Sequence, residues 1–249
     1  MPASPADVAD LELLAARSWC GLEEERLGDW LLRAGGGFTG RANSVLVVGR
    51  PPAAPAEAVT AVTRWYSGRG LRPRAQLPMP GAEAADSAFA AAGWSRDDGD
   101  VLVLTAPLAG WAAPEVAVDL ADEPSDAWLA GYRYRGTPLP PVARAVLMTG
   151  DRPVFAAVRL TPAPAPLAAV ARGAVVGDWL VVTAVTVDEA FRRRGLGTAV
   201  MAALAAWGAG RGAASCLLQV SSDNAPALAL YERLGFAEHH RYHYRLAPA

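Results

Sequence analysis

Cysteine is nearly absent from this chain of 249 residues, which has only Cys20 and Cys216. They lie far apart and form no C-x-x-C pair, so we expect neither a disulfide framework nor a zinc site. The three histidines are also a weak metal motif, because His239, His240 and His243 fall within one expected strand, where side chains alternate between faces. We therefore expect reduced thiols and no metal.

Long apolar runs and a strong charge of either sign are absent too. No uninterrupted apolar segment approaches the ~20 residues that span a bilayer, and the first five residues lack the basic and apolar regions of a signal peptide. A net charge of −2 and a pI of about 5.9 argue against a general nucleic-acid or membrane-surface binder. We expect a cytoplasmic protein with no nucleic-acid or membrane partner.

The chain does contain a glycine turn between an apolar segment and a helical one. Residues 179–187 are rich in β-branched side chains and predict a buried strand, whereas Val200, Leu204 and Trp207 follow the turn at helical spacing. A helix entered through glycines presents unbonded backbone N–H groups and the positive end of its dipole to an anion. Residues 191–198, which include three consecutive arginines, are thus predicted to bind a phosphate group.

The spacing of this turn limits which phosphate it binds. Neither a Walker A loop nor a three-glycine dinucleotide fingerprint is present. The segment Arg192-x-x-Gly195-x-Gly197 resembles instead the Arg/Gln-x-x-Gly-x-Gly/Ala motif of the GNAT superfamily of acyl-CoA-dependent N-acetyltransferases. On this short motif alone, a solvated turn is the alternative.

Periodicity and turn residues predict the other elements. Glu23, Glu24 and Glu25 are expected on a solvated face, Ser125 is the N-cap candidate of its helix, and the glycine-rich residues 35–40 favour a hairpin loop over a second phosphate site. We expect helices over 7–19, 58–67, 82–92, 125–134 and near 226–235; strands over 30–32, 44–48, 74–77, 101–105, 115–118, 215–220 and the C-terminal end; and a hairpin joining 144–148 to 154–160.

The sequence also repeats internally. A shift of 142 positions aligns residues 61–94 without gaps to the second half, with Trp65 on Trp207 and Gly93-Trp94 on Gly235-Phe236. A repeat of this length predicts two similar domains in tandem, residues 1–106 and 107–249. The first copy has Arg50-Pro-Pro-Ala-Ala-Pro where the second has its glycine turn, and proline has no N–H to donate. The first copy is therefore expected to keep the fold and to lack the chemistry.

A second motif strengthens the resemblance to GNAT domains. Asn224-x-Pro226-Ala227-x-x-x-Tyr231-x-x-x-Gly235-Phe236 follows the first motif at the family's spacing, and the whole chain resembles actinobacterial tandem GNAT proteins with a degenerate N-terminal copy. The resemblance implies an α/β (α+β) fold with two GNAT-like domains, each a mixed, mostly antiparallel sheet flanked by helices. In the C-terminal copy, the family's fourth and fifth strands would splay apart and leave a slot.

The resemblance implies direct transfer of an acetyl group from acetyl-CoA to a primary amine of a small molecule or protein. Tyr231 would protonate the leaving thiolate, although a packed core aromatic is the alternative for this residue. The residues expected to bind acetyl-CoA are Val185, Thr186, Val187, Arg192, Arg193, Arg194, Gly195, Leu196, Gly197, Thr198, Asn224, Ala227 and Tyr231.

The general base and the acceptor are less well defined. Val181 occupies the position, eleven residues before Arg192, at which some family members have a glutamate. Asp178 is the nearest carboxylate, and water relayed to backbone carbonyls is the alternative. The residues expected to contact the acceptor are Trp128, Tyr132, Tyr134 and Arg135, which could equally contact the N-terminal half.

Two other functions compete with the enzyme. The protein could be a non-catalytic acyl-CoA-binding sensor or scaffold, whereas a nucleotide-binding module is disfavoured by the missing Walker and dinucleotide patterns. The N-terminal half is expected to be a packing partner or a wall of the acceptor cleft, and the protein a monomer or homodimer.

Overall fold

The computed structural model describes residues 3–132, 136–160 and 166–248. The chain forms two compact units. Unit 1 comprises Met1–Val103, Val220–Asn224 and Glu238–Ala249, and unit 2 comprises Leu104–Gln219 and Ala225–Ala237. The predicted domains, 1–106 and 107–249, remain a prediction, because these units are defined by contacts and group the C-terminal strand with unit 1.

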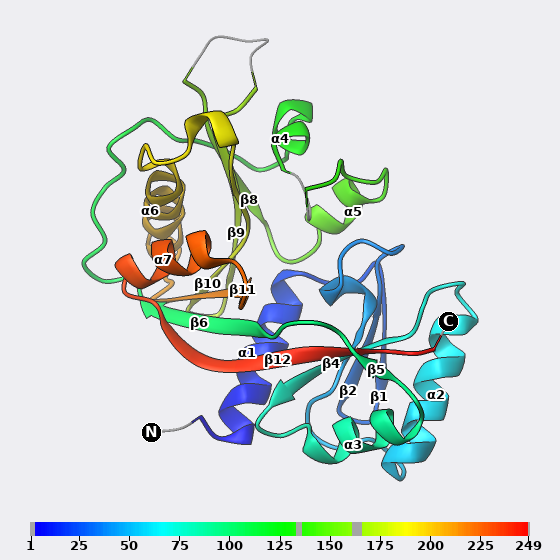
Figure 1. Cartoon of the computed structure of the whole chain (residues 1–249). Coiled ribbons are helices and arrows are strands. Elements are labelled where there is room, and N and C mark those ends of the chain that lie inside the picture. The colour runs from blue at the N-terminus through cyan, green and yellow to red at the C-terminus, as the bar shows by residue number, and fades with distance from the viewer. Residues whose placement is uncertain (1–2, 133–135, 161–165, 249) are drawn as a thin grey trace. The chain divides into compact units, whose positions relative to one another are not determined.

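Unit 1 contains a mixed sheet (Figure 1). Among the described pairs, β3 and β4 are parallel, whereas β1–β2, β2–β3, β4–β12 and β5–β12 are antiparallel. Its strands, in spatial order, are β1 (Glu23–Leu27), β2 (Trp30–Ala34), β3 (Val45–Leu46), β4 (Arg74–Met79) and β12 (Ala237–Leu246), with β5 (Ser95–Arg96) also paired to β12. The acidic residues 23–25 are exposed as expected, but they form an outer strand. This edge is charged, which discourages pairing with another chain.

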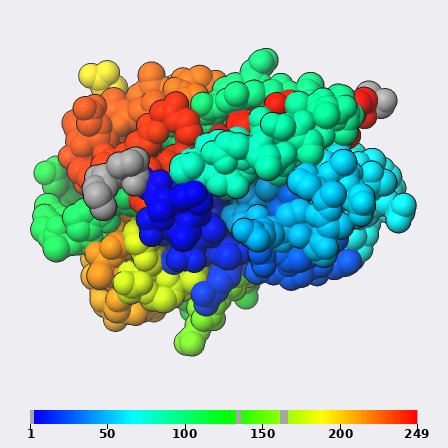
Figure 2. Space-filling model, turned by 90° about the horizontal axis from the view of Figure 1, so that it is seen from below, coloured from blue at the N-terminus to red at the C-terminus, as the bar shows by residue number. Residues whose placement is uncertain are grey.

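Three helices and a 3₁₀ turn, η1 (Arg41–Asn43), accompany this sheet. Helix α1 (Pro5–Ser18) begins with a capping box made by Ser4 and Asp7 and packs against β4. Helices α2 (Pro55–Ser67) and α3 (Glu83–Ala91) pack against each other over a core that includes Trp30, Tyr66 and Phe89. Figure 2 shows α1 in dark blue and α2 in cyan on the face of unit 1 turned to the viewer.

The glycine-rich loop of unit 1 does not present its amides to a ligand. The backbone N–H groups of Gly35 and Gly37 donate to Oδ1 of Asn43, at 2.9 and 2.8 Å. The loop joins the antiparallel strands β2 and β3. The predicted hairpin loop is therefore confirmed, and these amides are already satisfied.

The strands of unit 2 also pair in both parallel and antiparallel directions. These strands, in spatial order, are β11 (Ser215–Ser221), β10 (Trp179–Val187), β9 (Ala169–Val176), β8 (Val154–Val158) and β7 (Asp119–Ala121). Strands β10 and β11 are parallel, whereas β9–β10, β8–β9 and β7–β8 are antiparallel. The division between the units falls within β6 (Val101–Pro107).

Helices cover both faces of this sheet. Helix α6 (Leu196–Ala209) packs on β8, β9 and β10, where Gly208 brings its backbone close to the Leu180 side chain. Helices α4 (Asp126–Gly131) and α5 (Ala143–Leu147) lie on the opposite face (Figure 1). Helix α7 (Ala225–Arg233) follows β11 in sequence. The expected mixed α/β fold with flanking helices is confirmed.

Two predicted strands of the second half are wrong. Residues 144–148 were expected as a hairpin strand, but residues 144–147 belong to helix α5, whose buried Ala143, Val146 and Leu147 follow helical rather than alternating spacing. Residues 115–118 are irregular, and the strand, β7, comes one residue later. The Ser125 N-cap is confirmed, because its side chain accepts from the Trp128 amide.

Candidate active site

The N-terminus of α6 has the geometry of an anion-binding turn. Gly195 is its N-cap residue with φ +72°, and no side chain among the described residues caps it. The first intrahelical bond runs from the Ala199 amide to the Gly195 carbonyl, at 3.0 Å. The amides that precede Ala199 in this turn have no intrahelical acceptor and point out of the helix end.

Glycine is required at the two positions of this turn for different structural reasons. In the described part of the chain, a Cβ on Gly195 would meet nothing within 4 Å, so its positive φ explains the glycine. A Cβ on Gly197 would lie 2.9 Å from Cδ2 of Leu230 in α7, so this glycine permits close packing of the two helices. One glycine therefore shapes the turn, and the other brings α7 to it.

The arginines of the turn are exposed, and two of them are held by local contacts. Arg192 pairs with Glu189 of the 3₁₀ turn η2 (Glu189–Phe191) at 3.1 Å, and the Arg194 guanidinium lies 5.5 Å from the Phe191 ring centroid. Arg193 has a left-handed backbone, with φ +64°. Positive charge thus borders the turn without capping its amides.

Strands β10 and β11 part immediately before this turn. Their described pairing ends at Val182↔Leu218, although both strands continue. On its other side, β10 has a β-bulge between Thr183 and Thr186, where Ala184 has φ +57°. The half-buried main chain of Val185, Thr186 and Val187 therefore lies beyond the last pair with β11, where an extended ligand could add to the edge.

Tyr231 of α7 combines burial with a hydroxyl that makes no hydrogen bond in the described part of the chain. Its side chain is 6% exposed, and its ring packs edge-on against Phe236 at 5.6 Å. Burial raises the pKa of this phenol, and the nearby Cys216 thiol adds to the rise. The phenol therefore stays protonated through the neutral range and can only donate a proton there.

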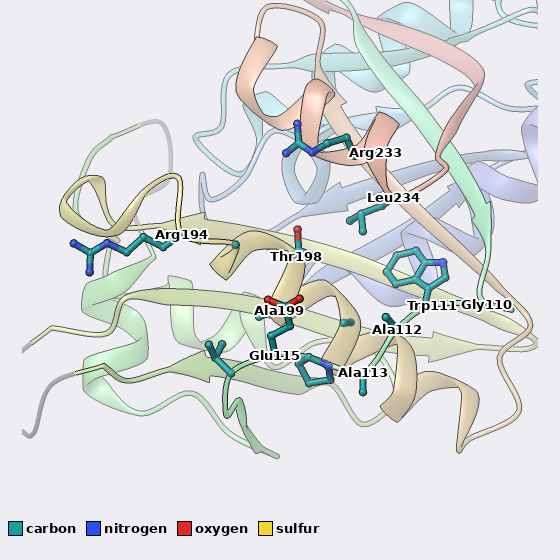
Figure 3. Close-up of a pocket in the computed structure, with 14 residues that line it drawn as sticks. Gly110, Trp111, Ala112, Ala113, Glu115, Arg194, Thr198, Ala199, Arg233 and Leu234 are labelled. Atoms are coloured by element: carbon teal, nitrogen blue, oxygen red, sulfur yellow. The ribbon is translucent and has the colours of Figure 1, made fainter.

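A pocket of about 440 Å³ lies beside the first turn of α6 (Figure 3). It is bounded by the segment Gly110–Val116, by the start of α6 and by Arg233 and Leu234 at the end of α7. In Figure 3 the Glu115 carboxylate points toward the first turn of α6 at Thr198 and Ala199. Both signs of charge therefore line the pocket.

The structure does not bring Asp178 to this site. It lies in the turn between β9 and β10, where its carbonyl accepts from the amides of Ala214 and Ser215. Val185 comes seven residues later along β10, or roughly 23 Å at the rise of an extended strand. Val181, the position where some relatives have a glutamate, is buried and apolar. Neither residue supplies a base at the parting of the strands.

The expected acceptor residues are core residues where they are described. Trp128 is 2% exposed, packs edge-on against Phe155 at 5.1 Å and donates through Nε1 to the Ala156 carbonyl. Tyr132 is buried beside Trp128, with ring centroids 5.7 Å apart. Tyr134 and Arg135 lie outside the described residues. Burial gives Trp128 and Tyr132 a packing role.

The remaining motif residues, Asn224 and Ala227, lie directly before α7 and within it. Ala227 is half-buried within the helix. Asn224 directly precedes the helix, belongs to unit 1, and donates through its backbone N–H to the Ser221 carbonyl at 3.1 Å. Among the residues that the structure describes, no group of three or more His, Cys, Asp or Glu could hold a metal ion. No described helix has the length and apolarity to cross a membrane.

Sequence reasoning missed two residues of this region. Thr183 has a buried hydroxyl next to the bulge, but in sequence it is one polar residue inside an apolar strand. Glu115 lines the pocket from an irregular segment that was expected to be a strand. No local pattern distinguishes either residue, since both depend on how distant segments pack.

Comparison with known proteins identifies the family. The model of the family described as "Probable histone acetyltransferase Rv0428c C-terminal" matches residues 5–245. This chain belongs to that family of GNAT N-acetyltransferases. It is 33% identical over 257 aligned positions to the "Probable histone acetyltransferase Rv0428c" of Mycobacterium tuberculosis, covering all of this chain and 76% of that protein.

Solved structures show the same fold. The GCN5-related N-acetyltransferase from Kribbella flavida matches with a TM-score of 0.68 at 17% identity, covering 97% of this chain and 96% of the other. A tandem GNAT protein from the clavulanic acid biosynthesis pathway matches with a TM-score of 0.65 at 15% identity, covering 100% and 91%. These structures show that the chain has the mixed α/β GNAT fold. The family model and the relative from Mycobacterium tuberculosis show that it is an acetyltransferase, and GNAT enzymes in general use acetyl-CoA.

Proposed function

We propose that this GNAT enzyme transfers an acetyl group from acetyl-CoA directly to a primary amine of a small molecule or a protein. The observation that supports this most is the arrangement around β10. The strand leaves β11, bulges at Ala184 and leads into the uncapped N-terminus of α6. Along the backbone, a strand edge that can pair with an extended ligand is therefore followed by a helix N-terminus that can bind phosphates.

The residues present fit acetyl-CoA. The backbone amides of Arg193, Arg194, Gly195, Gly197 and Thr198 would hold the pyrophosphate, because the turn is open in front of Gly195 and no side chain among the described residues caps it. The main chain of Val185–Val187 would hold the pantetheine. The pocket between Arg194 and Arg233 would accept the nucleotide end.

The chain's own residues would manage the protons of the transfer. Acetyl-CoA supplies the activated acetyl group, whose bond to sulfur breaks as the bond to the amine nitrogen forms. Tyr231 would donate its proton to the leaving thiolate, and an amide of Val185 or Thr186 would stabilise charge on the acyl oxygen. We assign removal of the amine proton to water, because Asp178 lies at the other end of β10.

We also propose that the chain is a tandem of two GNAT-like domains, 1–106 and 107–249. The order α2–β4–α3 in the first half recurs as α6–β11–α7 in the second, and the parallel pair β3–β4 recurs as β10–β11. Helix α2 starts at Pro55 after Ala54, without a glycine turn. We therefore expect one acetyl-CoA site per chain, in a cytoplasmic monomer or homodimer.

The acceptor is either a protein amine or a small molecule. The similarity to a protein described as a probable histone acetyltransferase supports a protein amine. A panel of both kinds would be assayed by CoA thiol release, with the wild-type protein and Tyr231→Phe. We expect Tyr231→Phe to lower kcat by about 100-fold with little change in the KM for acetyl-CoA, because only proton donation is lost.

Tyr66→Phe is the matched control for this test. Its hydroxyl donates to the Arg33 carbonyl in unit 1 at 3.0 Å, so its loss should lower stability and leave kcat unchanged. Equal kcat values for wild type and Tyr231→Phe would rule out the proton-donor role. No thiol release by the wild type with any amine would rule out the enzyme for that panel.

A non-catalytic acyl-CoA-binding protein is the second candidate. The apolar Val181, at the position of the glutamate in some relatives, favours it. Calorimetry and the thiol-release assay together separate the two functions, because a sensor would bind acetyl-CoA but release no thiol in the presence of amines. Binding of ATP or NAD in place of acetyl-CoA would contradict both.

A further inference from the structure

Thr183 contains a buried hydroxyl that the proposed mechanism does not use. The residue is 6% exposed, and its Oγ1 has no hydrogen-bond partner among the residues that the structure describes. Leaving a buried hydroxyl unsatisfied costs free energy, and native proteins do so rarely. Such a group is explained if a ligand completes its hydrogen bond.

The hydroxyl lies where the two strands part. Thr183 is the last residue of β10 that pairs with β9 before the bulge, opposite Arg172. It follows directly on Val182, the last residue of β10 paired with β11 in the described chain. The next residue, Ala184, has a left-handed backbone. Thr183 therefore stands at the closed end of the gap into which the acetyl group is proposed to extend.

The face of the sheet shows which reactant the hydroxyl would meet. Phe155, Arg172 and Thr183 lie directly opposite one another on adjacent strands, so their side chains share a face. Phe155 packs against Trp128 of α4, and Arg172 donates through Nε to the Leu147 carbonyl of α5, at 2.8 Å. This is the face opposite α6.

Backbone amides and side chains of β10 point in different directions at this position. Amides of the strand edge lie in the plane of the sheet, toward the space left by β11, whereas side chains stand roughly perpendicular to it. A ligand extended along the edge would meet the amides. A ligand that approaches from the face of the sheet with α4 and α5 would meet the Thr183 hydroxyl. Acetyl-CoA is the ligand proposed to extend along the strand edge, so the hydroxyl would meet the other reactant.

We propose that Thr183 positions the acceptor amine, its hydroxyl oxygen accepting a hydrogen bond from the amine N–H as the nitrogen approaches the acetyl carbon. The proposal rests on the proposed function. A neutral hydroxyl does not remove the amine proton, which passes to water. The hydrogen bond from the amine to Thr183 instead fixes the direction of the nitrogen lone pair. Thr183 thereby serves the acceptor rather than acetyl-CoA.

Two variants test this role. Thr183→Val keeps the shape and removes the hydroxyl, whereas Thr183→Ser keeps the hydroxyl. In the free protein, we expect Thr183→Val to unfold at the wild-type temperature or above it, because no internal hydrogen bond is lost. In thiol-release assays with the best amine of the panel, we expect its kcat/KM for the amine to fall about tenfold with an unchanged KM for acetyl-CoA. Thr183→Ser should recover most of this loss.

Thr63→Val is the matched control, since the Thr63 hydroxyl donates within α2 of unit 1 and the same atoms are removed. A lower unfolding temperature for Thr183→Val than for Thr63→Val would show an internal partner and overturn the proposal. Unchanged amine kinetics, or a change confined to the KM for acetyl-CoA, would overturn it as well. An inactive wild-type protein would instead overturn the proposed function, and with it the role of Thr183.

Discussion

At the scale of single residues, unit 1 contains a line of polar contacts that joins α1, β4 and β12. Nδ1 of His239 and Nδ1 of His240 lie 2.9 Å apart, and Nε2 of His240 lies 3.0 Å from the buried Glu12. Gln76 donates to the other oxygen of Glu12 at 2.7 Å. One of the two imidazole nitrogens donates in this contact and the other accepts.

His239 should therefore make stability depend on pH. Burial lowers its pKa below the usual 6.5, and the neighbouring His240 lowers it further. Between the lowered pKa and 6.5 the unfolded chain binds more protons than the folded one. His239 thus contributes stability that is fully present above pH 6.5 and is lost as the pH falls through the lowered pKa.

Urea unfolding at a series of pH values between 8 and 5 would measure this effect. The wild-type free energy of unfolding should fall on acidification more steeply than that of His239→Asn, whose side chain does not titrate. Parallel curves for the two proteins would contradict the role of His239. Asp86 is not expected to contribute in this range, because its pKa is already lowered from 3.8.

The sequence predicted the site residues that backbone geometry requires. Gly195 is needed for its positive φ at the N-cap of α6, and the sequence predicted a glycine turn leading into a helix at this point. The sequence did not indicate that Trp128 is enclosed by Phe155 and the β8 backbone, because an aromatic residue on a helix can face core or ligand equally. Tertiary packing decides between these two roles.

At the scale of elements, the first turn of α6 can be tested by a pair of glycines. Gly195 and Gly177 have φ +72° and +62°, and in the described chain a Cβ on either would meet nothing within 4 Å. Alanine at each should cost ~1 kcal/mol of stability from backbone strain alone. Only Gly195→Ala should also weaken acetyl-CoA binding, because it disturbs the amides that face the phosphates.

Calorimetry and thermal unfolding of both variants would separate the two effects. Similar losses of stability, with roughly a tenfold weaker Kd in Gly195→Ala alone, are expected. Equal acetyl-CoA affinities in the two variants would mean that the turn does not contact the ligand.

The irregular segment Gly110–Val116 should weaken acetyl-CoA binding at the first turn of α6. Its Glu115 carboxylate points toward the α6 N-terminus, where it competes with phosphate oxygens for the positive end of the helix (Figure 3). Glu115→Gln should tighten CoA binding by roughly two- to fivefold, in keeping with an exposed charge interaction. Glu123→Gln, with the same charge change on the loop before α4, is the control, and an equal gain there would refute a local effect.

Element types followed from the sequence wherever periodicity was long. Strand β10 and helix α6 extend over 9 and 14 residues and match the expectation. Helix α5 has only 5 residues, and so short an apolar run does not distinguish a helix from a strand. The irregular residues 115–118 show the same limit, since alternation over four residues is weak evidence for a strand.

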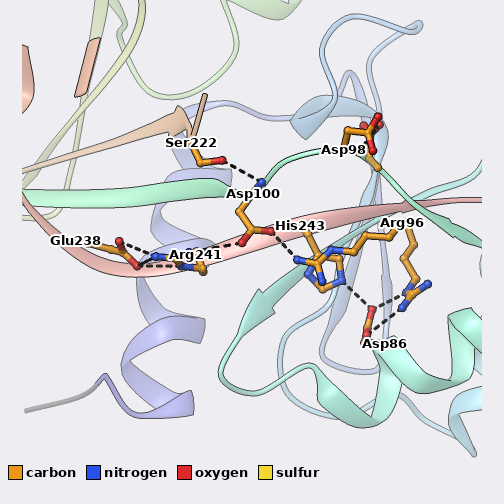
Figure 4. A network of polar contacts seen from close by, with 10 residues as sticks. Asp86, Arg96, Asp98, Asp100, Ser222, Glu238, Arg241 and His243 are labelled. Carbon is orange, nitrogen blue, oxygen red and sulfur yellow. Dashed lines mark hydrogen bonds and ion pairs between the residues drawn. The ribbon is translucent and has the colours of Figure 1, made fainter. Parts of the chain in front are cut away.

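At the scale of the whole molecule, the chain returns to unit 1 to complete it. Strand β12 pairs with β4 from Arg241↔Met79 to Leu246↔Arg74. Asp86 of α3 accepts from His243 at 2.8 Å and from Arg245 at 2.5 and 3.1 Å (Figure 4). Burial alone would raise the pKa of Asp86. The hydrogen bonds from His243 and Arg245 outweigh that effect, so the pKa of Asp86 is lowered. The end of the sequence is thus a structural part of unit 1.

This arrangement makes residues 107–249 a poor independent fragment, even though the repeat marks them as one domain. Without residues 1–106, β12 would lose β4 and expose an unpaired edge, and His243 and Arg245 would lose Asp86. We expect the fragment to show no cooperative thermal transition by circular dichroism and to be degraded rapidly by protease. The full chain should unfold cooperatively.

Asp86→Ala in the full chain is the graded control. It removes the carboxylate and keeps β4, so it should lower stability by about 1–3 kcal/mol and leave acetyl-CoA binding intact. A fragment 107–249 that unfolds cooperatively and retains full activity would show that residues 1–106 are dispensable. The N-terminal half would then be neither a packing partner nor part of the acceptor site.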